Sequence, residues 1–456
     1  MYRNIIIVVA LSLLVACQPT GQKNAEVETT KPFKSTYQAD SHKAFIITNV
    51  NLLDGAGNQI ENATVIVQNN KIHAVGSGSI DFAGDAETID AKGKWLSPGL
   101  IDNHSHLGVY PSPSISSTSD GNEMTSPDTA NVWAEHAVWP QDPGFNLARA
   151  GGVTSLQILP GSGNLFGGRG VTLKNIPSTS MMGMKFPDAP HALKMACGEN
   201  PKRVYGARKV MPSTRMGNMS MYRKSWIEAT DYMNKWDDYA AGNSADKPMR
   251  DLRLETLSEV LRGNIRIHNH CYRADEMLQM IALSKEFNYE IASFHHAVEA
   301  YKIAPELAKE NICSSMWSDW WGFKLEAFDG IKENIAMVEK AKACAIVHSD
   351  SAVGIQHLNQ DAAKAMASGN KAGIEITPAV AMQWITLNPA TSMGIADKTG
   401  SVEVGKAADL VLWDGNPFSV YTKVEQVFID GNKVYDIANT GYQAQSDYEL
   451  GLGLEE

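Results

Sequence analysis

Apolar runs of strand length alternate with amphipathic stretches of helix length through the middle of the chain, from about residue 98 to residue 397. Such alternation is typical of βα units whose strands pair into a parallel sheet. The predicted strands are 100–102, 153–159, 193–197, 265–268, 290–294, 312–315 and 345–348. The predicted helices include 252–262, 274–287, 300–310 and 331–343. About eight such units predict an α/β fold with a distorted (β/α)8 TIM-like barrel at 98–397.

The two ends of the chain that flank this region have a different pattern of apolar and polar residues. Short apolar runs separated by tight turns occur at residues 44–97 and again at 398–440. Asn69 and Asn70 lie between two such runs and tolerate the positive φ of a hairpin turn. Because two β-rich ends can pair with each other, they predict a small composite β-sandwich beside the barrel.

Residues 1–17 have the pattern of an export signal. Arg3 supplies a positive charge, and residues 5–15 form an apolar stretch too short to span a bilayer. The following Leu14-Val15-Ala16-Cys17 resembles the lipobox of bacterial lipoproteins, which implies cleavage before Cys17 and lipidation of that cysteine. An ordinary secretory signal is the alternative.

The predicted cellular location follows from this signal. Gln18 stands where an aspartate would favour retention in the inner membrane, so we expect an exported lipoprotein at the periplasmic face of the outer membrane or at the cell surface. Its only membrane contact would be the lipid anchor. Residues 18–43 are polar with little apolar periodicity, and they predict a flexible tether.

Composition sets the broad class. The chain has 456 residues, 43% of them hydrophobic, which is ample for one large α/β domain and a smaller one. A formal net charge of −11, with no run of Lys or Arg, argues against a nucleic-acid partner. A homo-oligomer is compatible with the sequence, which does not fix the oligomeric state.

Four cysteines remain beyond Cys17, namely Cys197, Cys271, Cys313 and Cys344. An exported chain with an even number of cysteines can pair them. Because three of the four lie in or beside strand-like runs without C-x-x-C spacing, we expect free buried thiols and leave disulfide pairing as the alternative.

The candidate chemistry begins at the first strand of the predicted barrel. His104 and His106 are two residues apart, so in a strand both project from the same face and can bind one metal ion. Further candidate ligands each close an apolar run: Glu199, His270, His296 and Asp350. Imidazole and carboxylate together suit Zn²⁺, and also Mn²⁺, Fe²⁺ or Co²⁺. Barrel active sites lie at the carboxyl ends of strands, where all these residues fall.

Six motifs together resemble the amidohydrolase superfamily, in the branch around imidazolonepropionase-like and prolidase-like members. They are PGLIDNHSH at 98–106, LPGSGNLFGGRG at 159–170, KMACGENPKR at 194–203, HCYRADEM at 270–277, HHAVEAYKIA at 295–304 and HSDSAVG at 348–354. The resemblance covers residues 45–436 and implies a distorted barrel with one or two divalent metal ions.

The same resemblance implies a role for each candidate residue. His104 and His106 would be ligands from the first strand, and His270 and His296 ligands from strands five and six. Asp350 would be the carboxylate of the last strand. It would accept a proton from the metal-bound water and pass it to the leaving nitrogen.

Several of these choices have a neighbour as alternative. His296 is preferred to His295, and His270 to His268, because the family spacing follows them; His348 is expected to support the site. Many family members use a carboxylated lysine from strand four, and Lys194 is the lysine available here. We predict Glu199 instead, because Lys194 lies five residues deeper and at the opposite parity of a regular strand.

Substrate-binding candidates are fewer. The glycine-rich stretch at 160–170 lacks the spacing of a nucleotide-binding loop, and its Arg169 is a candidate for binding a substrate carboxylate. Arg273, three residues after His270, is a second candidate. Trp317, Trp320 and Trp321 form an aromatic cluster that either lines the pocket or packs in the core.

The leading hypothesis is hydrolysis of a carbon–nitrogen bond in a small-molecule amide, peptide-like or cyclic amide substrate. A deaminase of a small heterocycle is an alternative, but such enzymes commonly have His-x-x-Glu after strand five, where this chain has Arg273. Imidazolonepropionases have Ser-Asp-Phe-Asn-Pro-Gly at strand eight, whereas this chain has Ser-Asp-Ser-Ala-Val-Gly at 349–354. This difference argues against the specific substrate of imidazolonepropionase. A non-catalytic, metal-dependent binding lipoprotein is the third hypothesis, and retention of Asp350 argues against it.

Overall fold

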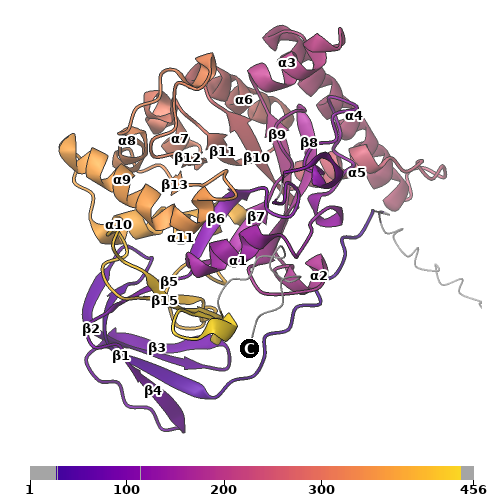
Figure 1. The fold of residues 1–456 in the computed structure, drawn as a ribbon. Coiled ribbons are helices and arrows are strands. Elements are labelled where there is room, and N and C mark those ends of the chain that lie inside the picture. The colour runs from indigo at the N-terminus through magenta and orange to yellow at the C-terminus, as the bar shows by residue number, and fades with distance from the viewer. Residues whose placement is uncertain (1–26, 28, 113, 443–456) are drawn as a thin grey trace, which may run out of the picture.

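The computed structural model of the protein describes residues 27, 29–112 and 114–442. These residues form a barrel of strands surrounded by helices, with a separate sheet beside it that contains the first and the last strands of the fold (Figure 1). The predicted export signal and Cys17 lie outside the described residues. In the part of the chain that is described, no helix combines the length and the apolar character needed to cross a bilayer.

The barrel sheet has eight strands in sequential order. They are β6 (Leu100–Ser105), β7 (Val153–Ile158), β8 (Phe166–Lys174), β9 (His191–Ala196), β10 (Ile265–Cys271), β11 (Ile291–His296), β12 (Cys313–Met316) and β13 (Ala345–Val347). Every neighbouring pair is parallel except those that involve β8, which is antiparallel to both β7 and β9. The predicted uniform βα repeat is therefore interrupted at its third strand by a hairpin.

The two edges of this sheet meet just beyond β13. The amide of Asp350 donates to the carbonyl of His104 across 3.3 Å, and the amide of Ser349 lies 3.5 Å from a carboxylate oxygen of Asp102. The sheet is thus nearly closed, and the closure brings the last candidate residue against the first.

Helices cover the outside of the barrel (Figure 1). They are α1 (Pro143–Ala150), α2 (Met181–Met184), α3 (Glu199–Ala207), α4 (Arg215–Ala240), α5 (Leu252–Leu261), α6 (Ala274–Phe287), α7 (Ala304–Lys309), α8 (Asn334–Lys340), α9 (Leu358–Lys371), α10 (Pro378–Gln383) and α11 (Leu387–Met393). The termini follow ordinary capping chemistry: Asp251 accepts hydrogen bonds from the amides of Arg253 and Leu254 in the first turn of α5, and Asn288, in the left-handed conformation, caps the end of α6.

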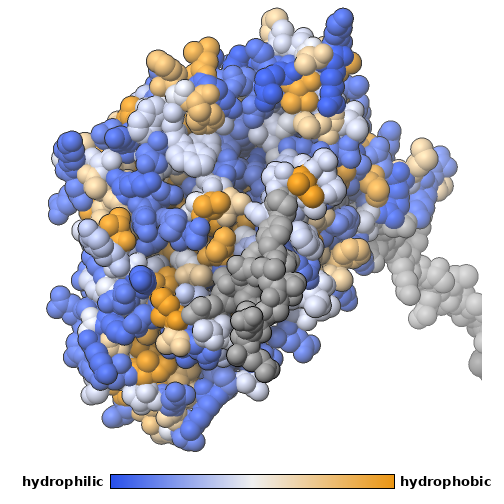
Figure 2. Space-filling view, viewed as in Figure 1, coloured by the Kyte–Doolittle hydropathy of each residue, from blue (hydrophilic) through white to orange (hydrophobic). Residues whose placement is uncertain are grey.

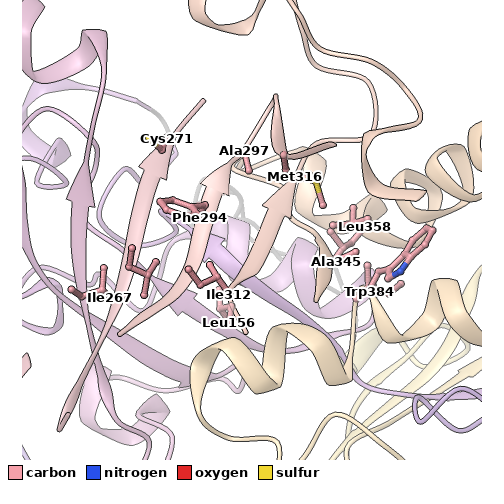
Figure 3. Close-up of a cluster of buried hydrophobic side chains, with 14 of the residues drawn as sticks. Leu156, Ile267, Cys271, Phe294, Ala297, Ile312, Met316, Ala345, Leu358 and Trp384 are labelled. Carbon is pink, nitrogen blue, oxygen red and sulfur yellow. The ribbon is translucent and has the colours of Figure 1, made fainter. Parts of the chain in front are cut away.

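The core lies between strands and helices. Apolar side chains from alternate positions of the strands, such as Ile267 on β10 and Phe294 on β11, are fully buried and belong to the same apolar cluster as Leu358 and Trp384 (Figure 3). Because period-two alternation sends the other residues of each strand into the barrel, the polar side chains of β6, β9, β10 and β11 converge inside it.

The second sheet also has eight strands, from both ends of the chain. They are β1 (Ala44–Leu53), β2 (Gln59–Gln68), β3 (Lys71–Ser77), β4 (Ala86–Asp90), β5 (Trp95–Pro98), β14 (Leu410–Trp413), β15 (Val424–Ile429) and β16 (Asn432–Asp436). β5 pairs antiparallel with β14, which confirms that the two ends combine. Hydrogen bonds join all eight strands into one continuous sheet, rather than the two facing sheets of the predicted sandwich.

Residues 29–43 contain no helix or strand but are attached to the rest of the protein, so the predicted flexible tether is revised there. Thr30 donates from its amide and its hydroxyl to Glu255, and the amide of Phe33 donates to Glu135. The amide of Thr36 donates to the carbonyl of Met182 across 3.0 Å. The extended segment runs along the barrel because its backbone polar groups find partners on the barrel's helices and loops.

The expectation of free thiols is wrong. Cys197 forms a disulfide with Cys271, and Cys313 forms one with Cys344. Cys197 follows β9 directly and Cys271 ends β10, while Cys313 begins β12 and Cys344 precedes β13. Neighbouring parallel strands bring residues at matching heights within bonding distance, so pairing needs no C-x-x-C spacing.

Candidate metal centre and active site

β6 carries the first two candidate ligands into the barrel. His104 Nε2 lies 3.5 Å and His106 Nε2 3.3 Å from the same carboxylate oxygen of Asp350. The side chain of His104 is 1% exposed, whereas those of His106 and Asp350 are 21% and 22% exposed. Solvent and any substrate therefore reach this group from the side of His106 and Asp350.

His296 and Asp350 reach the cluster through unusual backbone. His296 ends β11 with φ of 70°, and Asp350 follows β13 with φ of 50°, both in the left-handed region that side chains other than glycine rarely adopt. Ligand atoms of His104, His106 and Asp350 lie within 4.8 Å of one another, and so do those of His104, His296 and His348. Local strain of this kind is commonly found at functional sites, where the surrounding packing holds it.

His270 lies at the edge of this cluster. It is buried near the end of β10, and its ring centroid is 4.5 Å from that of His296. Its Nε2 is 3.4 Å from the side-chain amide of Asn200. The structure therefore brings His270 beside the other histidines, as the sequence predicted.

Glu199 lies away from the histidine cluster, whereas Lys194 lies beside it. β9 ends at Ala196, and Glu199 is already the first residue of α3, where its carboxylate pairs with Lys324 at 3.4 Å. Lys194 points into the barrel, fully buried, with Nζ 3.3 Å from His104 Nε2. Leu193 and Met195 pack in the outer core, so the strand's alternation itself directs Lys194 inward. The sequence analysis placed the end of this strand at Glu199, three residues later than the structure does.

Two further histidines order the ring of His104. His104 Nδ1 is 2.8 Å from His295 Nδ1, and His295 Nε2 is 2.8 Å from His268 Nδ1. If each ring donates to the next, Nδ1 of His104 carries the hydrogen and Nε2 keeps the lone pair, which is the form that can bind a metal ion. His295 therefore lies inside the barrel, because the left-handed turn at His296 lets both adjacent histidines point inward.

His106 is oriented in the same way by the backbone. Its Nδ1 is 2.7 Å from the carbonyl oxygen of Leu159, which can only accept, so Nδ1 carries the hydrogen and Nε2 the lone pair. Asp102, to which the sequence assigned no role, accepts hydrogen bonds from the amide of His104 and the hydroxyl of Ser349. It ties β6 to the residue that precedes Asp350.

Burial keeps the imidazoles neutral. It lowers the pKa of His104, His270 and His296 well below the usual histidine value, and that of His348 to about 4. Burial also lowers the pKa of Lys194, to about 7, against the attraction of Asp350. For Asp350 burial alone would raise the pKa, but the neighbouring His106, His348 and Lys194 leave it below its ordinary value.

The donor set fits a divalent cation. Nδ1 of His270, His296 and His348 is buried and has no hydrogen-bond partner among the described residues. Unpaired buried polar atoms are costly, and neutral imidazole with ionised carboxylate is the ligand set that Zn²⁺ and similar ions prefer. A metal ion at this cluster would satisfy atoms that otherwise lack partners.

Aromatic side chains form a wall beside the cluster. Trp317 stacks on His296 with ring centroids 4.3 Å apart, and Tyr272 stacks on the same ring at 5.4 Å. Trp317 is the first residue of the loop between β12 and α8. Five large apolar side chains of this loop are 40% to 85% exposed: Trp320, Trp321, Phe323, Leu325 and Phe328. Neither Trp317 nor Trp321 is simply a core residue, so the pocket-lining alternative fits better.

The two predicted substrate-binding arginines are not part of the cluster. Arg169, on β8, is buried against Trp133 and donates to the hydroxyl of Thr256. Arg273 precedes α6 and forms a two-pronged hydrogen bond with Asp275 at 2.9 Å. No ion pair or hydrogen bond joins either arginine to the histidines within the described ranges.

Known proteins resemble the chain along most of its length. A family model described as the amidohydrolase family matches residues 329–434. The crystal structure of an amidohydrolase from Thermotoga maritima MSB8 superposes with a TM-score of 0.79 at 36% identity, over 86% of this chain and 100% of that one.

Curated relatives extend the likeness. The amidohydrolase tasK of Hapsidospora irregularis is 31% identical over 92% of this chain and 43% of its own length, so the chain spans less than half of that relative. The imidazolonepropionase of Thermoplasma volcanium is 22% identical over 83% of this chain and 91% of its own. The 36% identity to the Thermotoga maritima amidohydrolase, over 86% of this chain and all of that one, shows that the chain belongs to the amidohydrolase family.

Proposed function

We propose that the protein is a metal-dependent hydrolase that cleaves a carbon–nitrogen bond in a small amide, peptide-like or cyclic amide substrate. The observation that carries this proposal is the convergence of His104, His106 and Asp350 at the open end of the barrel. A carboxylate held between imidazoles and still exposed to solvent is placed to touch both the cation and an incoming substrate.

The proposed ligands are His104, His106, His270, His296 and Asp350, with Lys194 in place of Glu199 as the contribution of β9. When bound, one or two divalent ions, with Zn²⁺ preferred, supply a Lewis acid that acidifies water and polarises a carbonyl. Lys194 suits the carboxylated form that the family resemblance implies, because an unprotonated amine can add carbon dioxide and release a proton.

Asp350 does the proton chemistry in this proposal. Its exposed carboxylate accepts a proton from the attacking water and returns it to the leaving nitrogen. The left-handed backbone of Asp350 and the hydrogen bond between Ser349 and Asp102 fix the position of this carboxylate beside the histidines. His295 and His268 take no part in the reaction and act as positioning residues for His104.

The aromatic wall favours substrates with an apolar group beside the scissile bond. Trp317 touches the ring of His296, and the exposed loop that follows it extends the apolar surface outward. Arg273, at the position where deaminases commonly have a glutamate, is paired with Asp275, and this supports amide hydrolysis over deamination of a heterocycle.

The test has two arms on the purified mature protein. Elemental analysis after reconstitution with Zn²⁺ or Mn²⁺ is expected to find at least about 0.5 metal ion per chain. A screen of dipeptides, N-acyl amino acids and cyclic amides is expected to yield a hydrolysed amide, and chelation is expected to abolish that activity. Metal binding without hydrolysis of any amide would favour the binding-lipoprotein alternative, and ammonia release from a heterocycle would favour the deaminase.

We also propose, from the sequence motif, that the protein is exported and anchored through a lipid on Cys17. The Cys17→Ser variant is expected to move from the membrane fraction to the soluble fraction, because the acyl chains supply the membrane affinity. A variant that still sediments with membranes would contradict the anchor.

A further inference from the structure

A cavity of about 670 Å³ lies far from the histidine cluster, between residues 29–37 and the amino-terminal ends of β9 and β10. Its wall includes Ser35, Lys185, His191 and Ile265. None of the candidate metal ligands lines it. The cavity opens at the end of the barrel opposite to the one where the carboxyl ends of the strands hold His270 and His296.

Arg169 is the unusual residue of this wall. Its side chain is 4% exposed, its guanidinium stacks on Trp133 at 4.0 Å, and Nε donates to the hydroxyl of Thr256 at 2.8 Å. Among the residues that the structure describes, Arg169 forms no ion pair, and neither terminal nitrogen donates a hydrogen bond. Burial lowers its pKa only to about 10, so it stays positively charged at neutral pH.

The other charged groups of the wall are already matched or solvated. Lys185 Nζ lies 2.5 Å from Glu135. Glu259 accepts a hydrogen bond from Asn264 at 2.8 Å, and Asp188 is exposed. Glu259, Glu255 and Glu135 attract Arg169 from beyond ion-pair distance, and Glu135 and Glu255 are paired with Lys185 and Arg250. Among the described residues, the buried guanidinium of Arg169 therefore has no direct anionic partner, which is costly.

We propose that this cavity is a second ligand site, which binds the carboxylate of a small amphipathic acid through Arg169. The planar guanidinium fork matches a carboxylate bidentately, and one unmatched cation favours a monoanion over a phosphate dianion. The cavity is much larger than a carboxylate, and Phe33, Phe186 and Ile265 offer apolar surface for the remainder of the molecule.

The test is calorimetric titration of the metal-loaded mature protein with benzoate, with benzamide as the neutral molecule of the same shape. Benzoate is expected to bind at least about tenfold more tightly than benzamide, because only the acid makes charge-assisted hydrogen bonds. Arg169→Gln is expected to weaken benzoate binding by at least about tenfold. Lys34→Glu, at an exposed residue of the wall that does not threaten the fold, is expected to weaken it as well.

A control separates this site from the metal centre, since a carboxylate can also bind a metal ion. His106→Gln is expected to leave benzoate binding unchanged. Three results would overturn the proposal: equal binding of benzoate and benzamide, undiminished binding by a folded Arg169→Gln variant, or loss of binding in His106→Gln. Because binding is the readout, the outcome does not depend on whether the protein hydrolyses amides.

Discussion

At the level of single residues, sequence patterns located most of the candidate site but misjudged details set by backbone geometry. His104, His106, His270, His296 and Asp350 come together as predicted. Lys194, and not Glu199, lies beside His104, because β9 ends three residues before Glu199. His295 was considered and set aside because strand alternation places it on the face opposite to His296, and no sequence signal indicates that His296 adopts a φ of 70°.

The positions of Lys194 and Glu199 give a direct prediction about metal affinity. Lys194→Met keeps the buried volume but removes the nitrogen 3.3 Å from His104, so metal affinity is expected to fall by at least about the 10- to 100-fold that outer-shell partners typically contribute. Competition with a chromogenic chelator measures it. Glu199→Gln is the matched control, since its carboxylate pairs with Lys324. A reversed order of effects would restore Glu199 as the ligand.

At the level of elements, periodicity predicted those with strong patterns. Helix α6 has the predicted bounds, and seven predicted strands overlap strands of the barrel sheet. The antiparallel β8 was missed because its glycines and buried Arg169 resemble a loop. Helix α4 was also missed: polar residues occur all around its 26 positions, so it lacks a clear apolar stripe. The disulfides needed the register of neighbouring strands, which the sequence does not contain.

The disulfide between Cys197 and Cys271 is expected to stabilise the barrel. It closes a loop of 74 residues, so replacing both cysteines by alanine is expected to lower the free energy of unfolding by about 2–4 kcal/mol. The same change at Cys313 and Cys344 is expected to cost somewhat less, because that loop spans 31 residues. Urea denaturation curves of the two double variants measure both. Equal stability of wild type and variants would contradict the structural role.

At the level of the whole molecule, attachments between distant segments join the parts. The two ends of the chain share one sheet, and residues 29–43 follow the barrel (Figure 1). Glu135 is central to this attachment: it accepts from the amide of Phe33 and from Lys185, and it contacts His191 at 3.2 Å. The surface on the side shown in Figure 2 is mostly hydrophilic with scattered apolar patches, as the acidic composition implies.

Glu135 also gives a pH prediction. Burial alone would raise its pKa, but hydrogen bonds from His191 and Lys185 lower it to about 2. A depressed carboxyl pKa contributes stability that is complete above about pH 4.5 and is lost as the pH falls toward 2, here roughly 3 kcal/mol. Glu135→Gln is expected to remove this pH dependence and to destabilise the protein at pH 7, since Lys185 then stays buried without its anion. Denaturation at pH 7 and pH 3 tests it.

The control for that experiment is Glu286→Gln, which removes an exposed partner of Arg223. Exposed ion pairs contribute little, so its stability is expected to follow the wild type at both pH values. If Glu135→Gln behaves like this control, residues 29–43 are not held through Glu135.

The central claim is that Asp350 moves protons at a metal centre formed by the barrel histidines. The measurement that tests it most directly is the hydrolysis rate per bound metal ion in the Asp350→Asn variant. Asparagine keeps the shape but cannot accept the proton, so the rate per metal ion is expected to fall about 10²- to 10⁴-fold while the fold survives. A folded, metal-loaded Asp350→Asn protein that stays within a few fold of the wild-type rate would contradict the claim.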